Sequence, residues 1–265
     1  MSDKKIKDNN ITTSVEFEKY LSEKAKNHRN YKYYSKSKYV KTILTTNAVF
    51  LSDGKNWNDK LDYANFTKSD TTCYKYALCL SYSKSESVAM WLLYSGNDGC
   101  MIDYNKKVID CILNTEFISL GEFSGNVFVE KAKLNKKDFD IEIFDIVYYG
   151  ETKKEFKDKY YVRRSDEINQ KFSKNLIDTI DCKKKKLSWS YENECRIIVS
   201  FKADLTKEKY SNLRIELPTE CKELILNNTY NSPNCKNGKY KESLLKKDLN
   251  WNLCKDCETN NNSSN

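Results

Sequence analysis

The chain has 265 residues, of which 39% are hydrophobic and only two are proline, which favours one large domain with polar ends over two separate cores. The 19 tyrosines and 11 phenylalanines exclude wholesale disorder. No apolar run approaches the ~20 residues that cross a bilayer, and the first ten residues are charged, which together predict a soluble cytoplasmic protein. The net charge of +8 comes from 46 basic and 38 acidic residues, but only five of the basic ones are arginine, so the surplus favours a lysine-rich solvated surface over a basic face for a polyanion.

In the first half of the chain, short helices and strands alternate. Thr13 and Glu16 form a capping-box pattern ahead of apolar residues at helical spacing. Strand-forming residues fill 76–82, and strict alternation begins after Gly99. The predicted elements, in order, are a helix over 14–27, strands over 31–34 and 48–52 with a helix over 35–47 between them, a loop over 53–72, a strand over 76–82, a helix over 85–95 and a strand over 100–104.

In the second half, a strong strand is predicted over 141–149. Apolar residues then recur at spacings of four or eight, which predicts a largely helical segment over 151–181. Further along come a solvated basic run over 183–186, strands over 194–201, 214–217 and 223–226, a short helix over 240–249 and a disordered end. We therefore predict an N-terminal helical extension (1–30), a core domain (31–226) and a polar C-terminal part (227–265).

The scarcity of histidine and glycine excludes several classes of enzyme. The single histidine, His28, is far in sequence from any nucleophile elbow, and the seven glycines form no phosphate-binding loop. Ten cysteines without a secretory signal indicate free thiols in a reducing compartment. Cys254 and Cys257 form one CxxC pair, with Cys221 and Cys235 upstream; a zinc site is possible there, but surface thiols are the simpler interpretation.

The octet from Trp189 to Arg196 is the most informative part of the chain. It places two carboxylates and an arginine at the start of a hydrophobic strand. In an extended chain Glu192, Glu194 and Arg196 share one face. Such a row either forms a structural ion network or lines a functional cleft, and the residues themselves leave both interpretations open.

A set of motifs in a fixed order resembles the bacterial domain-of-unknown-function family 2971 over residues 31–226. One departure is Lys60, where the family's pattern favours proline. The motifs are Tyr31-Lys32-Tyr33, Val49-Phe50-Leu51-Ser52, Trp57-Asn58-Asp59, Cys79-Leu80-Ser81-Tyr82-Ser83, Met90-Trp91-Leu92-Leu93-Tyr94, Gly99 to Tyr104, and Trp189-x-Tyr191-Glu192-x-Glu194-x-Arg196.

That family is similar, more distantly, to the ADP-ribosyltransferase superfamily, especially to toxins that modify nucleic acids. The resemblance implies an α+β fold with a central mixed or antiparallel sheet flanked by helices, and NAD as a substrate. It also implies a toxin or phage-defence effector that modifies a nucleic acid or a protein. Glu194 and Glu192 would be catalytic, and the NAD-binding residues would be Tyr31, Lys32, Tyr33, Ser81, Ser83 and Arg196.

The chemistry implied needs little besides carboxylates. Breaking the nicotinamide–ribose bond creates an oxocarbenium-like ribose that a carboxylate such as Glu194 stabilises, while Glu192 positions or deprotonates the acceptor and Lys32 or Arg196 contacts the pyrophosphate. Two other classes remain open: a non-catalytic module that binds nucleic acid or a partner through 183–186 and exposed aromatics, and a magnesium nuclease that uses Asp59 with the two glutamates.

Overall fold

The computed structural model describes residues 11, 13–27, 29–67, 72–82, 86–151, 159–164, 167–173, 180, 183–235 and 238–245. The helices are α1 (Ser14–Lys26), α2 (Ser37–Thr46), α3 (Lys60–Thr67), α4 (Val88–Tyr94), α5 (Lys106–Leu113) and α7 (Thr219–Asn227), with 3-10 helices η2 (Lys136–Asp138), η5 (Leu187–Glu192) and η6 (Ala203–Leu205). The strands are β1 (Asn30–Tyr34), β2 (Ala48–Ser52), β3 (Cys73–Tyr82), β4 (Cys100–Tyr104), β5 (Phe117–Ser124), β6 (Val127–Asn135), β7 (Phe139–Asp145), β8 (Val147–Glu151), β9 (Lys159–Arg164), β10 (Glu167–Ser173), β11 (Lys184–Lys186), β12 (Glu194–Lys202), β13 (Asn212–Glu216) and β14 (Thr229–Asn231).

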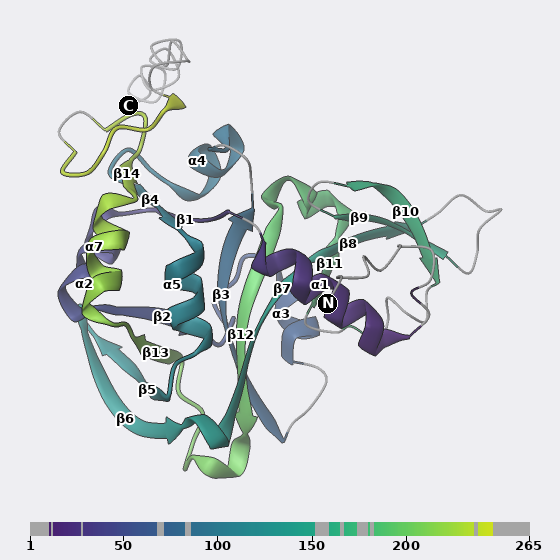
Figure 1. Cartoon of the computed structure of the whole chain (residues 1–265), viewed down its shortest axis with the longest axis horizontal. Coiled ribbons are helices and arrows are strands. Elements are labelled where there is room, and N and C mark those ends of the chain that lie inside the picture. The colour runs from purple at the N-terminus through teal and green to yellow at the C-terminus, as the bar shows by residue number, and fades with distance from the viewer. Residues whose placement is uncertain are drawn as a thin grey trace, which may run out of the picture.

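The fold is α+β, with an open, antiparallel sheet of ten strands flanked by helices (Figure 1). Eight strands follow the order β14-β4-β1-β3-β2-β13-β5-β6, and the sheet branches at β3, which also pairs with β12; β7 lies beyond β12. The coarse fold prediction is thereby confirmed. The branch at β3 places one end of this strand between β1 and β12.

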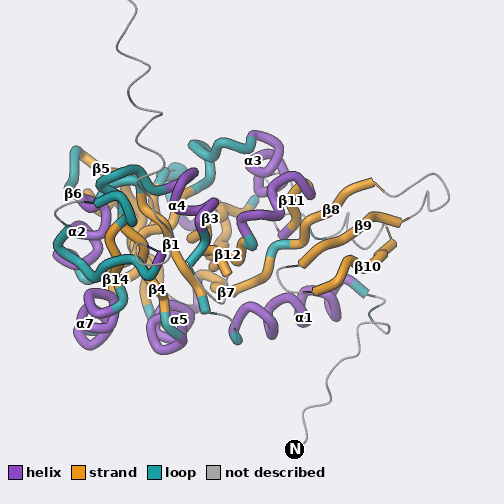
Figure 2. The backbone as a smooth tube through the Cα atoms, turned by 90° about the horizontal axis from the view of Figure 1, so that it is seen from above, coloured by secondary structure: helices purple, strands orange, loops and turns teal. Residues whose placement is uncertain are grey.

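Helices cover both faces of this sheet (Figure 2): α5 and α7 lie on one side, α3 and α4 on the other. The main core contains Ile112 of α5 and Ile225 of α7, together with one face of β3 and β12. Within it α5 packs against β7 and α7 packs against β4. The opposite face of the same two strands carries Cys79, Ser81, Glu194 and Arg196. This second face is buried as well. Near the start of β12 it is polar, and further along Ala77 and Ile198 belong to a second apolar cluster with Phe17 of α1 and Phe66 of α3.

The N-terminal helix forms as its sequence predicts. Thr13 accepts a hydrogen bond from the Glu16 backbone, and the Glu16 side chain accepts one from the Thr13 backbone, so both halves of the capping box are present. Phe17 and Leu21 are fully buried against Phe144 of β7. The helix thus packs against the core, as expected.

The predicted helix over 151–181 is wrong in its described part. Residues 159–164 and 167–173 form the hairpin β9–β10, which joins β8 and β11 in a separate four-stranded sheet. Even spacings of four and eight fit one face of a strand, where side chains alternate, as well as they fit a helix. The pattern therefore did not discriminate between the two.

Two smaller predictions are also wrong. Residues 223–226 belong to α7 rather than to a strand, and the expected loop over 53–72 contains α3. The Asp59 carboxylate accepts hydrogen bonds from the backbone N–H groups of Leu61 and Asp62 and so begins α3. Lys60 is then the first helical residue, a position that favours proline, so the proline of the family's pattern fits this helix.

The strand predicted over 141–149 is two strands in different sheets. The chain changes sheet at Ile146, whose backbone N–H donates to the Glu194 carbonyl at 2.9 Å. Downstream, the basic run over 183–186 is not a solvated loop: Lys183, Lys184 and Lys185 are buried, and β11 pairs parallel to β8. That prediction is corrected.

Beyond residue 226 the chain continues the sheet through β14, which pairs with β4. The helix predicted over 240–249 is wrong in its described part, because residues 240–244 are not helical and Lys241 instead bridges to Tyr230. The predicted disordered end, the Cys254–Cys257 pair and His28 lie outside the described residues. Among the helices that are described, none has the length and apolar content needed to cross a membrane.

Candidate functional site

A pocket of about 240 Å³ opens where the ends of β1, β3 and β12 meet. The loop before α3, the helix α4 and the segment from β11 to η5 complete its walls. The lining residues are Tyr31, Lys32, Tyr33, Asn56, Trp57, Asn58, Asp59, Asp62, Cys79, Leu80, Ser81, Met90, Tyr94, Lys185, Trp189, Glu192 and Glu194.

The register of three strands brings residues that are distant in sequence together. Ser81 of β3 pairs with Tyr31 of β1 on one side and with Glu194 of β12 on the other. Residues directly opposite each other in antiparallel strands point to the same face, so the three side chains form one row across the sheet. All three line the pocket.

A turn at Asn193 brings a second carboxylate into the pocket. Asn193 has a φ of 42°, in the left-handed region that asparagine tolerates better than most residues. This turn separates η5 from β12, so Glu192 and Glu194 approach the pocket from two different elements. Ser81 fixes the turn, because its hydroxyl donates to the Glu192 carbonyl at 2.6 Å.

Arg196 lies beneath the pocket and neutralises two carboxylates. Its guanidinium is fully buried, donates to Glu194 Oε1 at 2.6 Å through Nε, and forms two hydrogen bonds with Asp62 at 2.5 and 3.0 Å. The same group stacks on the Trp57 ring at 4.6 Å. A planar guanidinium with bidentate partners is the cation best suited to such burial.

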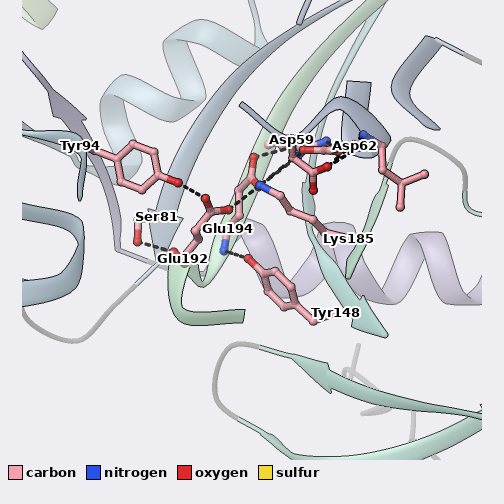
Figure 3. Close-up of polar contacts among 10 residues, drawn as sticks. Asp59, Asp62, Ser81, Tyr94, Tyr148, Lys185, Glu192 and Glu194 are labelled. Carbon is pink, nitrogen blue, oxygen red and sulfur yellow. Dashed lines mark hydrogen bonds and ion pairs between the residues drawn. The ribbon is translucent and has the colours of Figure 1, made fainter. Parts of the chain in front are cut away.

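Lys185 is the second cation of the site. Its ammonium nitrogen lies 2.5 Å from Glu192 Oε2, 3.3 Å from Glu194 Oε2 and 3.5 Å from Asp62 Oδ2. It also lies 4.8 Å from the centre of the Trp189 ring. Figure 3 shows the lysine side chain reaching into this group of carboxylates.

The two glutamates titrate in opposite directions. Burial alone would raise the pKa of Glu194, but Arg196 and Lys185 together hold it far below its usual value. Burial and the charge of Glu194 raise the pKa of Glu192, which Lys185 only partly offsets. Although burial disfavours its charge, the pKa of Lys185 is raised by Glu194 and Glu192. Glu194 is thus firmly ionised, and Glu192 is the carboxylate more easily protonated.

Aromatic side chains form the remaining walls. The Tyr94 hydroxyl donates to Glu192 Oε1, which leaves both oxygens of this carboxylate with a partner (Figure 3). Tyr33 packs edge-on against Trp91 at 5.1 Å, and its hydroxyl accepts from the Ser87 backbone at 2.9 Å. Burial, with Asp103 nearby, raises the pKa of Tyr31 to about 12, so the wall is uncharged at neutral pH.

Most of the residues singled out in the sequence meet at this pocket. The lining includes Tyr31, Lys32, Tyr33, Ser81, Glu192 and Glu194. Ser83 lies outside the described residues. Arg196 does not line the pocket: it is fully buried beneath it and paired with two carboxylates.

Two charged members of the site escaped the sequence analysis. Lys185 stood in a run of four lysines, and such runs are normally solvated. Asp62 fell in a segment predicted to be a loop. Only the spacing of Lys185 before Trp189 and the carboxylates set it apart from its neighbours, and spacing alone does not identify a buried lysine.

The nuclease alternative named Asp59, Glu192 and Glu194, and all three line the pocket. Among the described residues, however, no three His, Cys, Asp or Glu side chains are grouped so that they could hold a metal ion. Asp62, Glu192 and Glu194 instead contact Lys185, a cation that occupies the position between them.

Comparison with known proteins gives one match. Residues 90–197 match the family model Protein of unknown function (DUF2971), which confirms the resemblance to this family over that segment. The matched segment includes Tyr94, Lys185, Glu192 and Glu194. No curated protein matches the chain, and no solved structure matches it.

Proposed function

We propose that the protein is an NAD-dependent ADP-ribosyltransferase whose reaction takes place in this pocket. The observation that carries the proposal is the row formed by Tyr31, Ser81 and Glu194 across three paired strands. In the superfamily that the sequence resembles, an aromatic residue on an early strand, a serine on a middle strand and a glutamate on a late strand together hold NAD.

The charge and shape of the pocket support a positively charged ring as the leaving group. Four lining residues are acidic and two are lysines, and Arg196 below adds one positive charge, so carboxylates are in excess in a chain that is basic overall. At about 240 Å³ the pocket is smaller than the ~300–1,000 Å³ of whole-ligand sites, which suits the nicotinamide–ribose half of NAD. Lys32 at the wall then meets the pyrophosphate.

The two carboxylates take different parts in the reaction. The bond between the nicotinamide nitrogen and the ribose carbon breaks, and its electron pair neutralises the ring nitrogen. Glu194, which is ionised, stabilises the positive charge that develops on the ribose. Glu192 accepts the proton of the acceptor as the acceptor's nucleophile bonds to the same ribose carbon. Neither step requires a histidine.

The acceptor is a nucleic acid or a protein, and the biological role that we propose with it is that of a toxin or phage-defence effector. The resemblance to toxin-like transferases supports this role. Expression of the wild type should slow the growth of a bacterial host, and expression of a Glu194→Gln variant at the same level should not.

Nicotinamide release from NAD tests the activity directly. The full-length chain is incubated with NAD alone and with RNA, DNA or cell lysate, and nicotinamide is quantified by chromatography. We expect release with an acceptor, and a loss of roughly 100-fold or more in Glu194→Gln and in Glu192→Gln.

The control is Glu122→Gln in β5. Glu122 is a partly buried carboxylate that accepts a hydrogen bond from the Ser211 backbone and does not line the pocket. This variant should keep wild-type activity. The proposal is overturned if the wild type releases no nicotinamide with any acceptor, and the site assignment is overturned if both pocket variants remain fully active.

A further inference from the structure

Lys185 holds a position that the reaction as proposed does not explain. It is a buried lysine at the junction of three carboxylates, whereas Arg196 contacts only two of them. Glu194 and Asp62 each contact both cations. Glu192 contacts only one, because its two oxygens face Lys185 and the Tyr94 hydroxyl.

The two cations therefore differ in which carboxylates they can compensate. Removal of Lys185 leaves Glu194 and Asp62 paired with Arg196, but it leaves Glu192 buried beside the negative charge of Glu194 with an uncharged partner alone. A buried carboxylate in that situation takes up a proton, because its charged form is no longer compensated.

We propose that Lys185 is a positioning residue that keeps Glu192 ionised and directed into the pocket, so that Glu192 serves as the base for the acceptor. The inference rests on the proposed function, and it adds a residue that the resemblance does not supply. The Lys185 ammonium donates hydrogen bonds to Glu192 and Glu194, forms an ion pair with Asp62 at 3.5 Å and lies over the Trp189 ring.

Charged and titratable groups face Glu192 from several elements packed around it. The charged and titratable groups that face it are Tyr94 from α4, Tyr148 from β8, Lys185 from β11 and Glu194 from β12, with Asp62 of α3 and Arg196 one step further away. The side chains of β9, which also packs against η5, lie outside the described residues. Lys185 is the only cation among the described groups in direct contact with the Glu192 carboxylate.

Lys183 provides a matched control in the same segment. It is also buried and also paired, with Glu18 at 2.9 Å, and its ammonium lies over the Phe144 ring at 3.9 Å. It does not line the pocket. Replacement of Lys183 by methionine therefore removes a buried lysine without touching Glu192.

The test compares the pH dependence of nicotinamide release in Lys185→Met, Lys185→Arg and Lys183→Met. In Lys185→Met the rate at pH 7 should fall at least about tenfold and recover as the pH is raised, because a carboxyl whose pKa lies above the assay pH loses about tenfold of its ionised fraction for each unit of the difference. Lys185→Arg should retain most of the wild-type rate at pH 7, and Lys183→Met should show the pH dependence of the wild type.

A second measurement separates this inference from the proposed function. The Glu192 carboxyl carbon is followed by NMR in protein labelled with ¹³C-glutamate, with its signal assigned by loss in Glu192→Gln. Its titration should move to higher pH in Lys185→Met and not in Lys183→Met, whether or not NAD is cleaved. An unchanged Glu192 titration in folded Lys185→Met would falsify the inference, even if the transferase activity is confirmed.

If Lys185→Met does not fold alone, Lys185→Met/Glu192→Gln decides the question. Removing the charge of Glu192 should restore folding, which thermal unfolding detects, because the uncompensated carboxylate is then absent. A double variant as unstable as the single variant contradicts the proposed pairing.

Discussion

Over residues 194–199 both faces of β12 are buried, but one is apolar throughout, whereas the other carries two charges ahead of the apolar Ile198. On one face Ile197 and Val199 are fully buried in the main core. On the other face Glu194 and Arg196 are as inaccessible, yet both are charged. Burial of apolar groups stabilises a fold directly, whereas buried ion pairs often contribute little net stability because desolvation offsets the attraction.

Under the proposed function, the charged end of this face is maintained for chemistry rather than for stability. Apolar residues of similar volume would fill that face at no loss of stability. The charged end of that face lines the pocket, whereas Ile197 and Val199 lie in the main apolar core. Substitutions on the two faces should therefore differ in the size of the stability loss, in the pH dependence of that loss and in the effect on activity.

The largest effect on stability is expected for Arg196→Met. The substitution leaves Asp62 and Glu194 buried with Lys185 as their remaining cation, and breaking a buried pair by removing one partner costs about 3–5 kcal/mol. Urea unfolding followed by circular dichroism measures the loss. Arg196→Lys should lose less, since it keeps the charge but not the bidentate geometry. A change below about 1 kcal/mol in Arg196→Met would show that the network is not coupled to folding.

Acid should weaken the charged face selectively. The pKa of Glu194 is lower in the folded protein than in the unfolded chain, so its contribution to stability is complete above the unfolded value of about 4.3 and is lost as the pH falls toward the folded value. The free energy of unfolding of the wild type should therefore decrease as the pH is lowered below about 5. In Glu194→Gln this acid dependence should be smaller, and an identical pH dependence in both proteins would contradict the prediction.

Ile197→Val probes the apolar face. Loss of one buried methylene should cost about 0.5–1.5 kcal/mol, because the transfer free energy is lost and a small cavity remains. The substitution removes an apolar group and no charge, so the loss should be the same at pH 5 and pH 8. Thermal unfolding at the two pH values checks it, and a strongly pH-dependent loss would mean that the two faces are not independent.

The sequence predicted the strand β12 and its two faces, but it did not predict which charged residues meet at the pocket. Alternation identified β12, and its two faces followed from the period of two. The row of Tyr31, Ser81 and Glu194 was accessible only through the resemblance, because pairing register depends on contacts between segments far apart in the chain. Lys185 was missed for the same reason: a lysine run is solvated unless a distant strand pairs with it, and β8 does so here.

The helix predicted over 151–181 failed for a local reason. Its apolar spacings are all even, so they satisfy a strand face and a helix face alike, and the pairing of β8 with β9 and of β9 with β10 selects the strand. Tertiary contacts therefore decided the structure where the periodicity left two solutions. Asp62 was missed for a different reason. It lies in α3, a short helix with little amphipathic character, so the sequence there gave no periodic pattern that predicts a helix.

The smallest effect on stability, and a large effect on activity, is expected for Glu192→Gln. The pKa of Glu192 is raised by burial and by Glu194, so the folded protein already disfavours its charge. After the substitution Lys185 still has two carboxylate partners, Asp62 and Glu194. The free energy of unfolding at pH 7 should change by less than about 1 kcal/mol. Nicotinamide release should nevertheless fall roughly 100-fold, because the amide cannot accept the acceptor's proton. The two measurements on one variant separate a residue kept for chemistry from one kept for folding: a large loss of stability with full activity would assign Glu192 to the structural network instead.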